Sequence, residues 1–174
     1  MNTTKIFVTL ALALSLLILT SCKKKDDNSN PTPENGTVAP DFTLESNDGT
    51  TISLSDLKGK VIIVDFWASW CGYCKAENPN VVRMYNQYHD QGLEVLGISI
   101  DQNKEDWKMA ITEQQLPYLH VIDTQAWNAQ TVMDYGVNSI PHLALIDRNG
   151  NLVATSDQIG LLEIEMLKLL ANEN

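Results

Sequence analysis

A continuous apolar segment that leads directly into a pair of cysteines constrains this fold more than any other feature of the sequence. Residues 61–69, VIIVDFWAS, carry a single charged side chain. A short apolar run of this kind is typical of a strand buried on both faces, as in the centre of a parallel sheet. WCGYC follows at residues 70–74, and apolar residues then recur at helical spacing up to Gly92. The sequence therefore predicts a buried strand that ends at a helix, with Cys71 and Cys74 at the junction.

Predicted strands and helices alternate along the rest of the chain. Further strands are expected at residues 93–101 and 120–123, and further helical patterns at residues 103–115, 124–136 and 161–171. Hairpins are predicted around the turns Asn47-Asp48-Gly49 and Arg148-Asn149-Gly150. Pro79 is expected to kink the first helix. This order predicts an α/β fold with a central mixed β-sheet flanked by helices and an N-terminal β-hairpin extension.

Two expectations concern the packing of the helices. The tryptophans at positions 107 and 127 are expected to pack on the helices that carry them. The last helix is expected to contact the core through an apolar face made of Leu161, Ile164, Leu167, Leu169 and Leu170.

The first 37 residues are expected to lie outside the folded domain. Lys5 precedes an apolar stretch of 14 residues, Ile6 to Leu19, and this pattern predicts a secretory signal peptide over residues 1–21. The segment Leu19-Thr20-Ser21-Cys22 resembles a bacterial lipobox, which implies that Cys22 carries acyl chains that hold the protein on a membrane. An ordinary signal peptide with an incidental cysteine is the alternative.

Residues 22–37 are therefore interpreted as the lipidated cysteine and a disordered tether, and residues 38–174 as the folded domain. Lys25-Asp26-Asp27 resembles the export tag of some surface lipoproteins and also fits a solvated charge run. The expected location is extracytoplasmic, on the periplasmic face of a bacterial membrane or at the cell surface.

The folded domain is strongly acidic. Residues 38–174 hold eight Lys and Arg residues against 19 Asp and Glu residues, a net formal charge of −11. Such a surface repels nucleic acid, which is excluded as a partner. Export also sets the redox environment, because disulfides persist outside the cytoplasm.

The spacing of Cys71 and Cys74 disfavours three common uses of a cysteine pair. Structural zinc needs about four Cys or His ligands, but the chain has no second CxxC and its histidines, at 89, 120 and 142, are scattered. Covalent haem attachment needs CxxCH, and residue 75 is Lys. A structural disulfide across so short a loop gains little stability. We therefore expect no metal and no cofactor.

A redox role fits the position of the pair. Cys71 would lie at a helix N-terminus, where free N–H groups and the helix dipole favour the thiolate that attacks disulfides. Cys74 lies one turn further into the helix, within reach of Cys71. Cys71 is thus the expected nucleophile and Cys74 the expected resolving thiol.

VDFWASWCGYCK resembles the thioredoxin active-site segment. The chain also resembles the TlpA/ResA-like family of membrane-tethered thioredoxins over nearly all of residues 38–174. The resemblance is carried by PDF near the start of the domain, by ISLSDLKGK, by SIPHLALIDRNGNL and by the lipoprotein-like N-terminus. The resemblance implies a thioredoxin-like fold and an extracytoplasmic protein thiol–disulfide oxidoreductase.

The resemblance also implies roles for particular residues. Ile140-Pro141 matches the cis-proline that faces the active-site disulfide, with the Ile140 backbone pairing with an extended substrate. Asp65 matches the carboxylate that takes the proton of the resolving cysteine. Many tethered relatives carry Asn there, so this position follows the thioredoxin pattern. Glu77 matches a glutamate that tunes the cysteines.

Three further residues are expected to meet the substrate. Trp70 offers an apolar surface, and Gly72-Tyr73 is the dipeptide between the cysteines, which influences the reduction potential in this superfamily. Gly-Tyr matches neither the Gly-Pro of reducing thioredoxins nor the Pro-His of strong oxidants. The dipeptide therefore does not predict the reduction potential of the cysteine pair.

The predicted function is reduction of disulfides in exported proteins through a Cys71–Cys74 cycle. Candidate substrates are apocytochrome c, other exported proteins with wrong disulfides, and an enzyme that needs reactivation; a membrane electron donor would regenerate the dithiol. The chain is expected to act as a monomer. Two alternatives stay open, a thiol peroxidase of the peroxiredoxin type and a non-catalytic thioredoxin-fold binding module. The peroxidase is disfavoured because FWASWCGYC lacks the threonine of P-x-x-x-T-x-x-C.

Overall fold

Two adjacent parallel strands, β3 (Val61–Trp67) and β4 (Leu93–Ser99), form the centre of the structure. Every residue of both strands is buried, as the apolar pattern predicts. The computed structural model describes residues 33–172, so the predicted signal peptide, Cys22 and most of the predicted tether lie outside the described residues. The end of that tether is ordered, because the N–H of Gly36 donates to the carbonyl of Leu152.

Five strands extend this pair into a mixed sheet with the order β2-β1-β5-β4-β3-β6-β7. β5 (Leu119–Ile122) is parallel to β4, whereas the hairpin of β6 (His142–Ile146) and β7 (Leu152–Ser156) adds antiparallel strands beside β3. The predicted N-terminal hairpin, β1 (Thr43–Ser46) and β2 (Thr51–Ser53), joins the opposite edge through antiparallel pairing of β1 with β5. The predicted fold class is confirmed.

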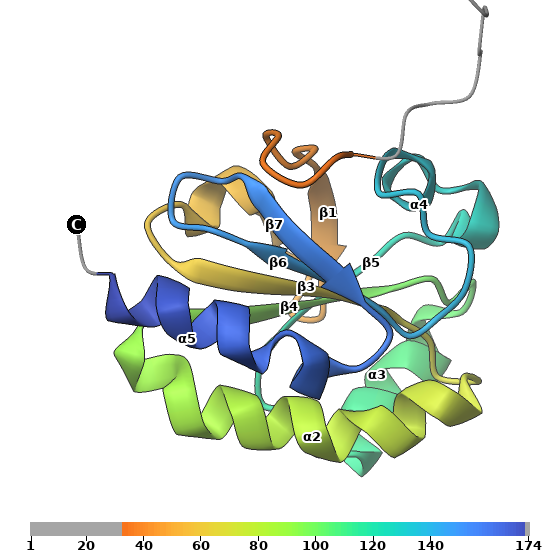
Figure 1. Ribbon diagram of the computed structural model, residues 1–174. Coiled ribbons are helices and arrows are strands. Elements are labelled where there is room, and N and C mark those ends of the chain that lie inside the picture. The colour runs from red at the N-terminus through yellow and green to blue at the C-terminus, as the bar shows by residue number, and fades with distance from the viewer. Residues whose placement is uncertain (1–32, 173–174) are drawn as a thin grey trace, which may run out of the picture.

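The helices cover the sheet on both sides (Figure 1). α2 (Gly72–Tyr88) and α5 (Glu163–Ala171) lie together on one face, and α2 runs without a break through Pro79. α3 (Lys104–Glu113) adjoins α2, and the two are linked by a hydrogen bond from Asn78 Nδ2 to Gln114 Oε1 at 2.7 Å. α4 (Gln130–Asp134) lies by the N-terminal segment. Short 3₁₀ turns complete the chain: η1 (Leu54–Leu57), η2 (His89–Gln91), η3 (Ala126–Asn128) and η4 (Ile159–Leu161).

The helix predicted over residues 124–136 is wrong in its extent. The segment divides into η3 and the short α4, because Ala126 has a left-handed φ of 55° and Ala129 is extended, and neither conformation continues a helix. Trp107 is fully buried as predicted, but the prediction for Trp127 is wrong, since 43% of its surface is exposed.

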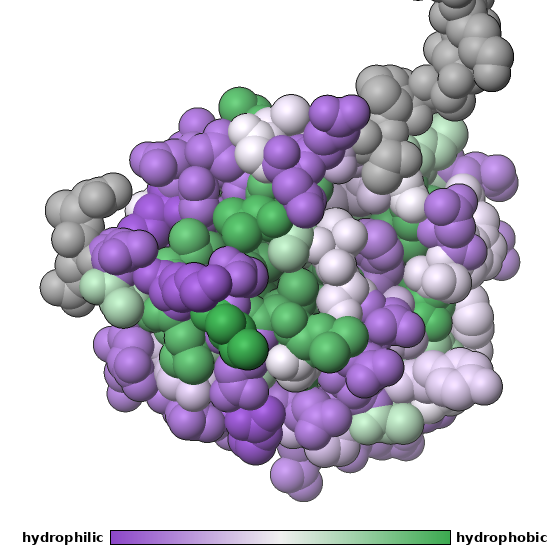
Figure 2. Space-filling model, viewed as in Figure 1, coloured by the Kyte–Doolittle hydropathy of each residue, from purple (hydrophilic) through white to green (hydrophobic). Residues whose placement is uncertain are grey.

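The apolar face predicted for the last helix is also partly wrong. Met166 and Leu170 are the buried residues of α5, whereas Leu161, Ile164 and Leu167 are exposed. Leu161 lies in η4, before the helix begins at Glu163, and α5 packs on the core through Met166 and Leu170 rather than through Ile164 and Leu167. Figure 2 shows apolar side chains gathered on this side of the molecule, over the region of α5.

Candidate active site

The two cysteines lie where β3 passes into α2. Cys71 is the N-cap of α2 and Cys74 is in its first turn, and a disulfide joins them. The backbone N–H of Cys74 points to Cys71 Sγ, with an N···S distance of 3.0 Å. Only 5% of Cys71 and 1% of Cys74 is exposed, so Cys71 is the more accessible. The helix N-terminus thus directs a donor at the sulfur of Cys71, which favours its thiolate in the reduced protein.

The loop before β6 lies against this disulfide. A cis peptide bond joins Ile140 and Pro141, and the carbonyl oxygen of Ile140 is 3.7 Å from Cys71 Sγ. These residues follow Cys71 by about 70 positions in the chain, and the antiparallel pairing of β6 with β3 brings them to the site.

Asp65 is the charged residue inside β3, and only 2% of it is exposed. Burial, and then the nearby negative charge of Glu77, raise the pKa of Asp65 from its ordinary value of 3.8 to about 7. No hydrogen bond within the described residues reaches its carboxyl group, which leaves burial unopposed. A carboxyl group with a pKa near neutrality can exchange a proton under ordinary conditions.

Glu77 is half-buried and its two oxygens have different partners. Oε1 accepts a 2.8 Å hydrogen bond from the backbone N–H of Ile159, and Oε2 accepts one at 3.1 Å from Asn80 Nδ2. The carboxylate therefore links α2 to the turn η4 and also acts on Asp65. Sequence spacing gave no sign of the contact with Ile159.

A pocket of about 480 Å³ connects several of the predicted site residues. Glu77 and Tyr73 line it from α2, and Ile140 and Pro141 line it from the facing loop. Tyr73 is 83% exposed, so its ring is free to meet a partner. A polypeptide in this pocket would lie beside the disulfide.

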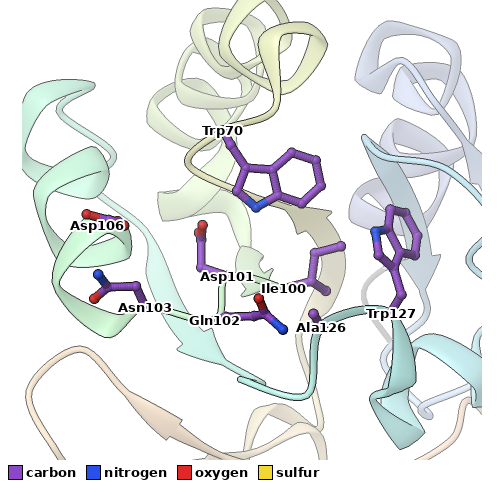
Figure 3. A pocket seen from close by; sticks show the side chains of 8 residues that line it. All are labelled: Trp70, Ile100, Asp101, Gln102, Asn103, Asp106, Ala126 and Trp127. Atoms are coloured by element: carbon purple, nitrogen blue, oxygen red, sulfur yellow. The ribbon is translucent and has the colours of Figure 1, made fainter.

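Trp70 is placed apart from these residues, in a second pocket (Figure 3). Trp70, which directly precedes Cys71 in the chain, is 58% exposed. Gly72 begins α2, and there is open space where a Cβ would stand. The structure thus divides the predicted substrate-facing residues between the two sides of the cysteine pair.

Asp101 supports the active-site loop and was not singled out by the sequence pattern. It lies just after β4, and its carboxylate accepts hydrogen bonds from the Ser69 N–H at 2.8 Å, the Ser69 hydroxyl at 2.7 Å and the Ser99 hydroxyl at 2.7 Å. Three donors stabilise a buried carboxylate and fix the segment immediately before Trp70. A polar residue at the end of a buried parallel strand is a signal that could have identified it.

A row of residues across three strands connects Asp65 to a buried histidine. Gly97 of β4 pairs with Asp65 on one side and with His120 of β5 on the other, so all three point to the same face of the sheet. Burial lowers the pKa of His120 to about 3, so the imidazole is neutral. Its ring packs against Trp67 and Tyr118, with centroids 5.5 Å and 4.5 Å away.

The rings of His120, Trp67 and Tyr118 carry buried polar atoms that make no hydrogen bond within the described residues. Both ring nitrogens of His120, Trp67 Nε1 and the Tyr118 hydroxyl are buried without a hydrogen-bond partner among residues 33–172. Burial and the charge of Asp65 raise the pKa of Tyr118. A glycine inside an otherwise apolar strand is a sequence signal that could have indicated a close approach at this point.

The arrangement can carry out disulfide exchange. It holds two cysteines at a helix N-terminus, a buried carboxyl group with a near-neutral pKa, and a backbone carbonyl beside the outer sulfur. Within the described residues, no group of three or more His, Cys, Asp or Glu side chains is placed to hold a metal ion.

Three similarities bear on these features. The chain is 34% identical to the thiol-disulfide oxidoreductase ResA of Geobacillus thermodenitrificans over 117 residues, which are 67% of this chain and 66% of that protein. It is 32% identical to ResA of Oceanobacillus iheyensis over 149 residues, 83% of this chain and 75% of that protein. The solution structure of a thiol:disulfide interchange protein from Bacteroides sp. superposes with a TM-score of 0.74 at 31% identity, covering 83% of this chain and 95% of that one.

The chain spans about two thirds of the length of the first of these relatives. The AhpC/TSA family matches residues 35–155, from the start of the described structure to the last strand of the sheet. The matched region includes Asp65, both cysteines and Ile140-Pro141. The chain therefore belongs to the AhpC/TSA family, and its fold is thioredoxin-like.

Proposed function

We propose that the chain is a thiol–disulfide oxidoreductase that reduces disulfides in exported proteins. The observation that carries the proposal is the Cys71–Cys74 disulfide at the N-terminus of α2, with the Ile140 carbonyl 3.7 Å from its outer sulfur. The relatives named ResA are thiol-disulfide oxidoreductases, and this supports the same reaction here.

The reaction has two exchange steps. In the reduced protein, the Cys71 thiolate attacks one sulfur of the substrate disulfide, a mixed disulfide forms, and the other substrate sulfur leaves as a thiolate. The Cys74 thiolate then attacks Cys71 Sγ, which forms the Cys71–Cys74 disulfide and releases the second substrate thiolate. Two electrons pass from the protein to the substrate, and a separate donor must return them.

Asp65 is the proposed acceptor of the Cys74 proton. Because its pKa is raised to about 7, the ionised carboxylate is a stronger base than an ordinary aspartate. Burial is the main cause of the raised pKa of Asp65, and the negative charge of Glu77 adds to it, so Glu77 is a tuning residue rather than a base. Its hydrogen bond to Ile159 keeps the carboxylate in place.

The substrate contacts are proposed from exposure and position. Tyr73 and the backbone of Ile140 would hold an extended segment in the pocket of about 480 Å³, with Pro141 closing one side. Gly72 leaves room over the disulfide, and Trp70 covers the other side. Apocytochrome c and other exported proteins with wrong disulfides remain candidate substrates.

Membrane attachment is a separate part of the proposal. Cys22 would carry the lipid anchor and place the domain near a membrane electron donor. The part of the chain that the structure describes contains no helix long and apolar enough to cross a membrane. The support for the anchor is therefore the sequence Leu19-Thr20-Ser21-Cys22.

Trapping tests the proposal. The reduced Cys74→Ser variant should stall as a mixed disulfide through Cys71 when mixed with oxidised exported proteins, and mass spectrometry would identify the partner. The Cys71→Ser variant should trap far less. If neither variant forms mixed disulfides, and the wild type instead consumes peroxide at the expense of a thiol, the thiol peroxidase alternative is correct.

A further inference from the structure

The second pocket beside the cysteines has a composition of its own. It has a volume of about 380 Å³ and lies between the active-site loop, the end of β4, the start of α3 and η3. Its walls include two indoles, one aliphatic side chain and two carboxylates: Trp70, Trp127, Ile100, Asp101 and Asp106. None of the eight residues that line it is basic.

Two exposed tryptophans from distant parts of the chain meet at this pocket. Figure 3 shows the indoles of Trp70 and Trp127 near Ile100, with Asp106 on the side of α3. Trp127 is 43% exposed although it belongs to a tightly held turn. The turn is fixed by Asp123, whose Oδ1 accepts the N–H of Gln125 at 3.1 Å and whose backbone carbonyl accepts the N–H of Ala126 at 3.2 Å.

The backbone next to Trp127 is strained. Ala126, its neighbour, has a φ of 55°, a left-handed conformation that residues other than glycine, Asn and Asp rarely adopt. The turn thus combines local backbone strain at Ala126 with an exposed indole at Trp127. Conformations of this kind are concentrated at binding sites.

The charges of the pocket favour a cation. Asp106 is exposed in the first turn of α3, and Asp101, whose carboxylate accepts hydrogen bonds from Ser69 and Ser99, also lines the pocket. The N-terminus of α3 acts against this with the equivalent of about half a positive charge. Two full negative charges exceed it, and the side chain of Asn103 already accepts one of the free N–H groups, that of Glu105.

The nearby lysine does not neutralise the pocket. Lys104 lies between the two aspartates in the chain, but its Nζ is 2.5 Å from an oxygen of Glu45 on β1. Indole faces attract cations through their quadrupole, so an ammonium or guanidinium group would gain from the rings and from Asp106 together. An apolar side chain would gain only from the rings, and an anionic one would be repelled.

We infer that this pocket is a specificity subsite for a lysine or arginine side chain of the substrate, close to the cysteine that Cys71 attacks. The inference rests on the proposed function, because it places the substrate disulfide at Cys71. Trp70 precedes Cys71 directly, so a substrate chain that presents its sulfur to Cys71 has residues within one or two positions of the pocket. The net charge of −11 on residues 38–174 would also attract basic substrates from a distance.

Model peptides with an internal disulfide provide the test. Three peptides would differ at one position beside the attacked cysteine, which would be lysine, norleucine or glutamate, and kcat/KM would be measured for each. The reduced wild type should prefer lysine to norleucine by roughly five- to tenfold, as a partly exposed cation–π contact and a surface ion pair together allow. Glutamate should be the poorest, and high salt should shrink all three differences.

Substitutions in the pocket test whether its residues cause the preference for lysine. Asp106→Asn and Trp127→Leu should each reduce the ratio of kcat/KM for the lysine peptide to kcat/KM for the norleucine peptide by about threefold. Trp127→Phe should restore part of the preference, because it restores an aromatic face. Glu105→Gln is the matched control: it removes the same charge from the same turn of α3, outside the pocket, and should leave the preference unchanged at about 0.15 M salt, where the Debye length is about 8 Å.

The outcomes separate this inference from the proposed function. Equal kcat/KM for all three peptides, or a lysine preference that survives both Asp106→Asn and Trp127→Leu, would overturn the subsite and leave the oxidoreductase intact. A norleucine preference would mean that the pocket is an apolar contact only. If the wild type reduces none of the peptides, both proposals fail together.

Discussion

The imidazole of His120 lies directly over Gly97, so that a Cβ on Gly97 would stand 2.7 Å from His120 Nδ1. The same Cβ would also lie 3.0 Å from Trp67 Nε1. The absence of a side chain at this one position of β4 thus lets two large rings from neighbouring strands meet beside Asp65.

Gly97→Ala should therefore destabilise the protein. The added methyl group must displace His120 or Trp67, both fully packed, and overpacking of this kind costs about 1–3 kcal/mol. Chemical denaturation would measure the free energy of unfolding. Gly160→Ala is the control, because open space surrounds that position, and it should change stability little. Equal stability of Gly97→Ala and the wild type would mean that the rings are more loosely packed than the structure shows.

Asp65→Asn should stabilise the protein, and more so at high pH. Between pH 3.8 and about 7 the folded protein keeps a proton on Asp65 that the unfolded chain releases, so the free energy of unfolding falls as the pH rises. At about 1.4 kcal/mol per pH unit, this loss reaches up to about 4 kcal/mol above pH 7. The variant should lack it, and denaturation at pH 4 and pH 8 would reveal the difference.

The same variant should also slow the second exchange step, because Cys74 loses its proton acceptor. Stopped-flow kinetics of the mixed disulfide would measure this step separately from the first attack by Cys71. Unchanged kinetics with increased stability would show that Asp65 is a buried carboxyl group without a part in the reaction.

Glu77→Gln should shift the titration of Asp65 to lower pH. The substitution removes the negative charge that raises the pKa of Asp65, and it retains an oxygen that accepts the Ile159 N–H. Stability should change little, whereas Glu77→Ala should cost about 1–2 kcal/mol because it leaves the buried Ile159 N–H unpaired. Carboxyl NMR signals followed against pH would report the titration. A titration of Asp65 that is the same in the wild type and in Glu77→Gln would contradict the coupling.

Cys71 should react with iodoacetamide roughly tenfold faster than Cys74 in the reduced protein at neutral pH. Cys71 is more exposed and receives the N–H of Cys74 at the start of α2, whereas Cys74 is almost completely buried. Peptide mapping after brief alkylation would identify the modified residue. Faster labelling of Cys74 would reverse the assigned roles.

Cys22→Ala should release the protein from the membrane and leave disulfide reduction by the domain unchanged. The anchor and the cysteine pair are separated by the predicted tether, so loss of one should not affect the other. Membrane fractionation and an insulin reduction assay would measure the two properties separately. A variant that stays in the membrane fraction would point to an uncleaved N-terminal segment as the anchor.

Local features of the sequence were sufficient to predict the two central strands and the position of the cysteine pair at the start of a helix. A short apolar run such as residues 61–69 is typical of a strand buried inside a sheet, and a cysteine at the N-cap of a helix lies beside free N–H groups whatever the rest of the fold. β3, β4, the two hairpins and the junction that holds Cys71 and Cys74 therefore followed from short segments. The resemblance of Ile140-Pro141 to the thioredoxin loop indicated a partner for that junction from another part of the chain.

Only the tertiary structure decided the contacts between distant segments. The bond from Ile159 to Glu77 spans 82 positions, and the exposure of Trp127 depends on a left-handed residue that no helical pattern reveals. α5 carries apolar residues on more than one face, and only its packing in the fold decides that Met166 and Leu170 are buried while Ile164 and Leu167 are exposed. Asp65 is identified by sequence as a carboxylate in an apolar strand, but its pKa near 7 requires the whole sheet to exclude water and α2 to bring Glu77 near, because burial and charge are properties of the assembled fold.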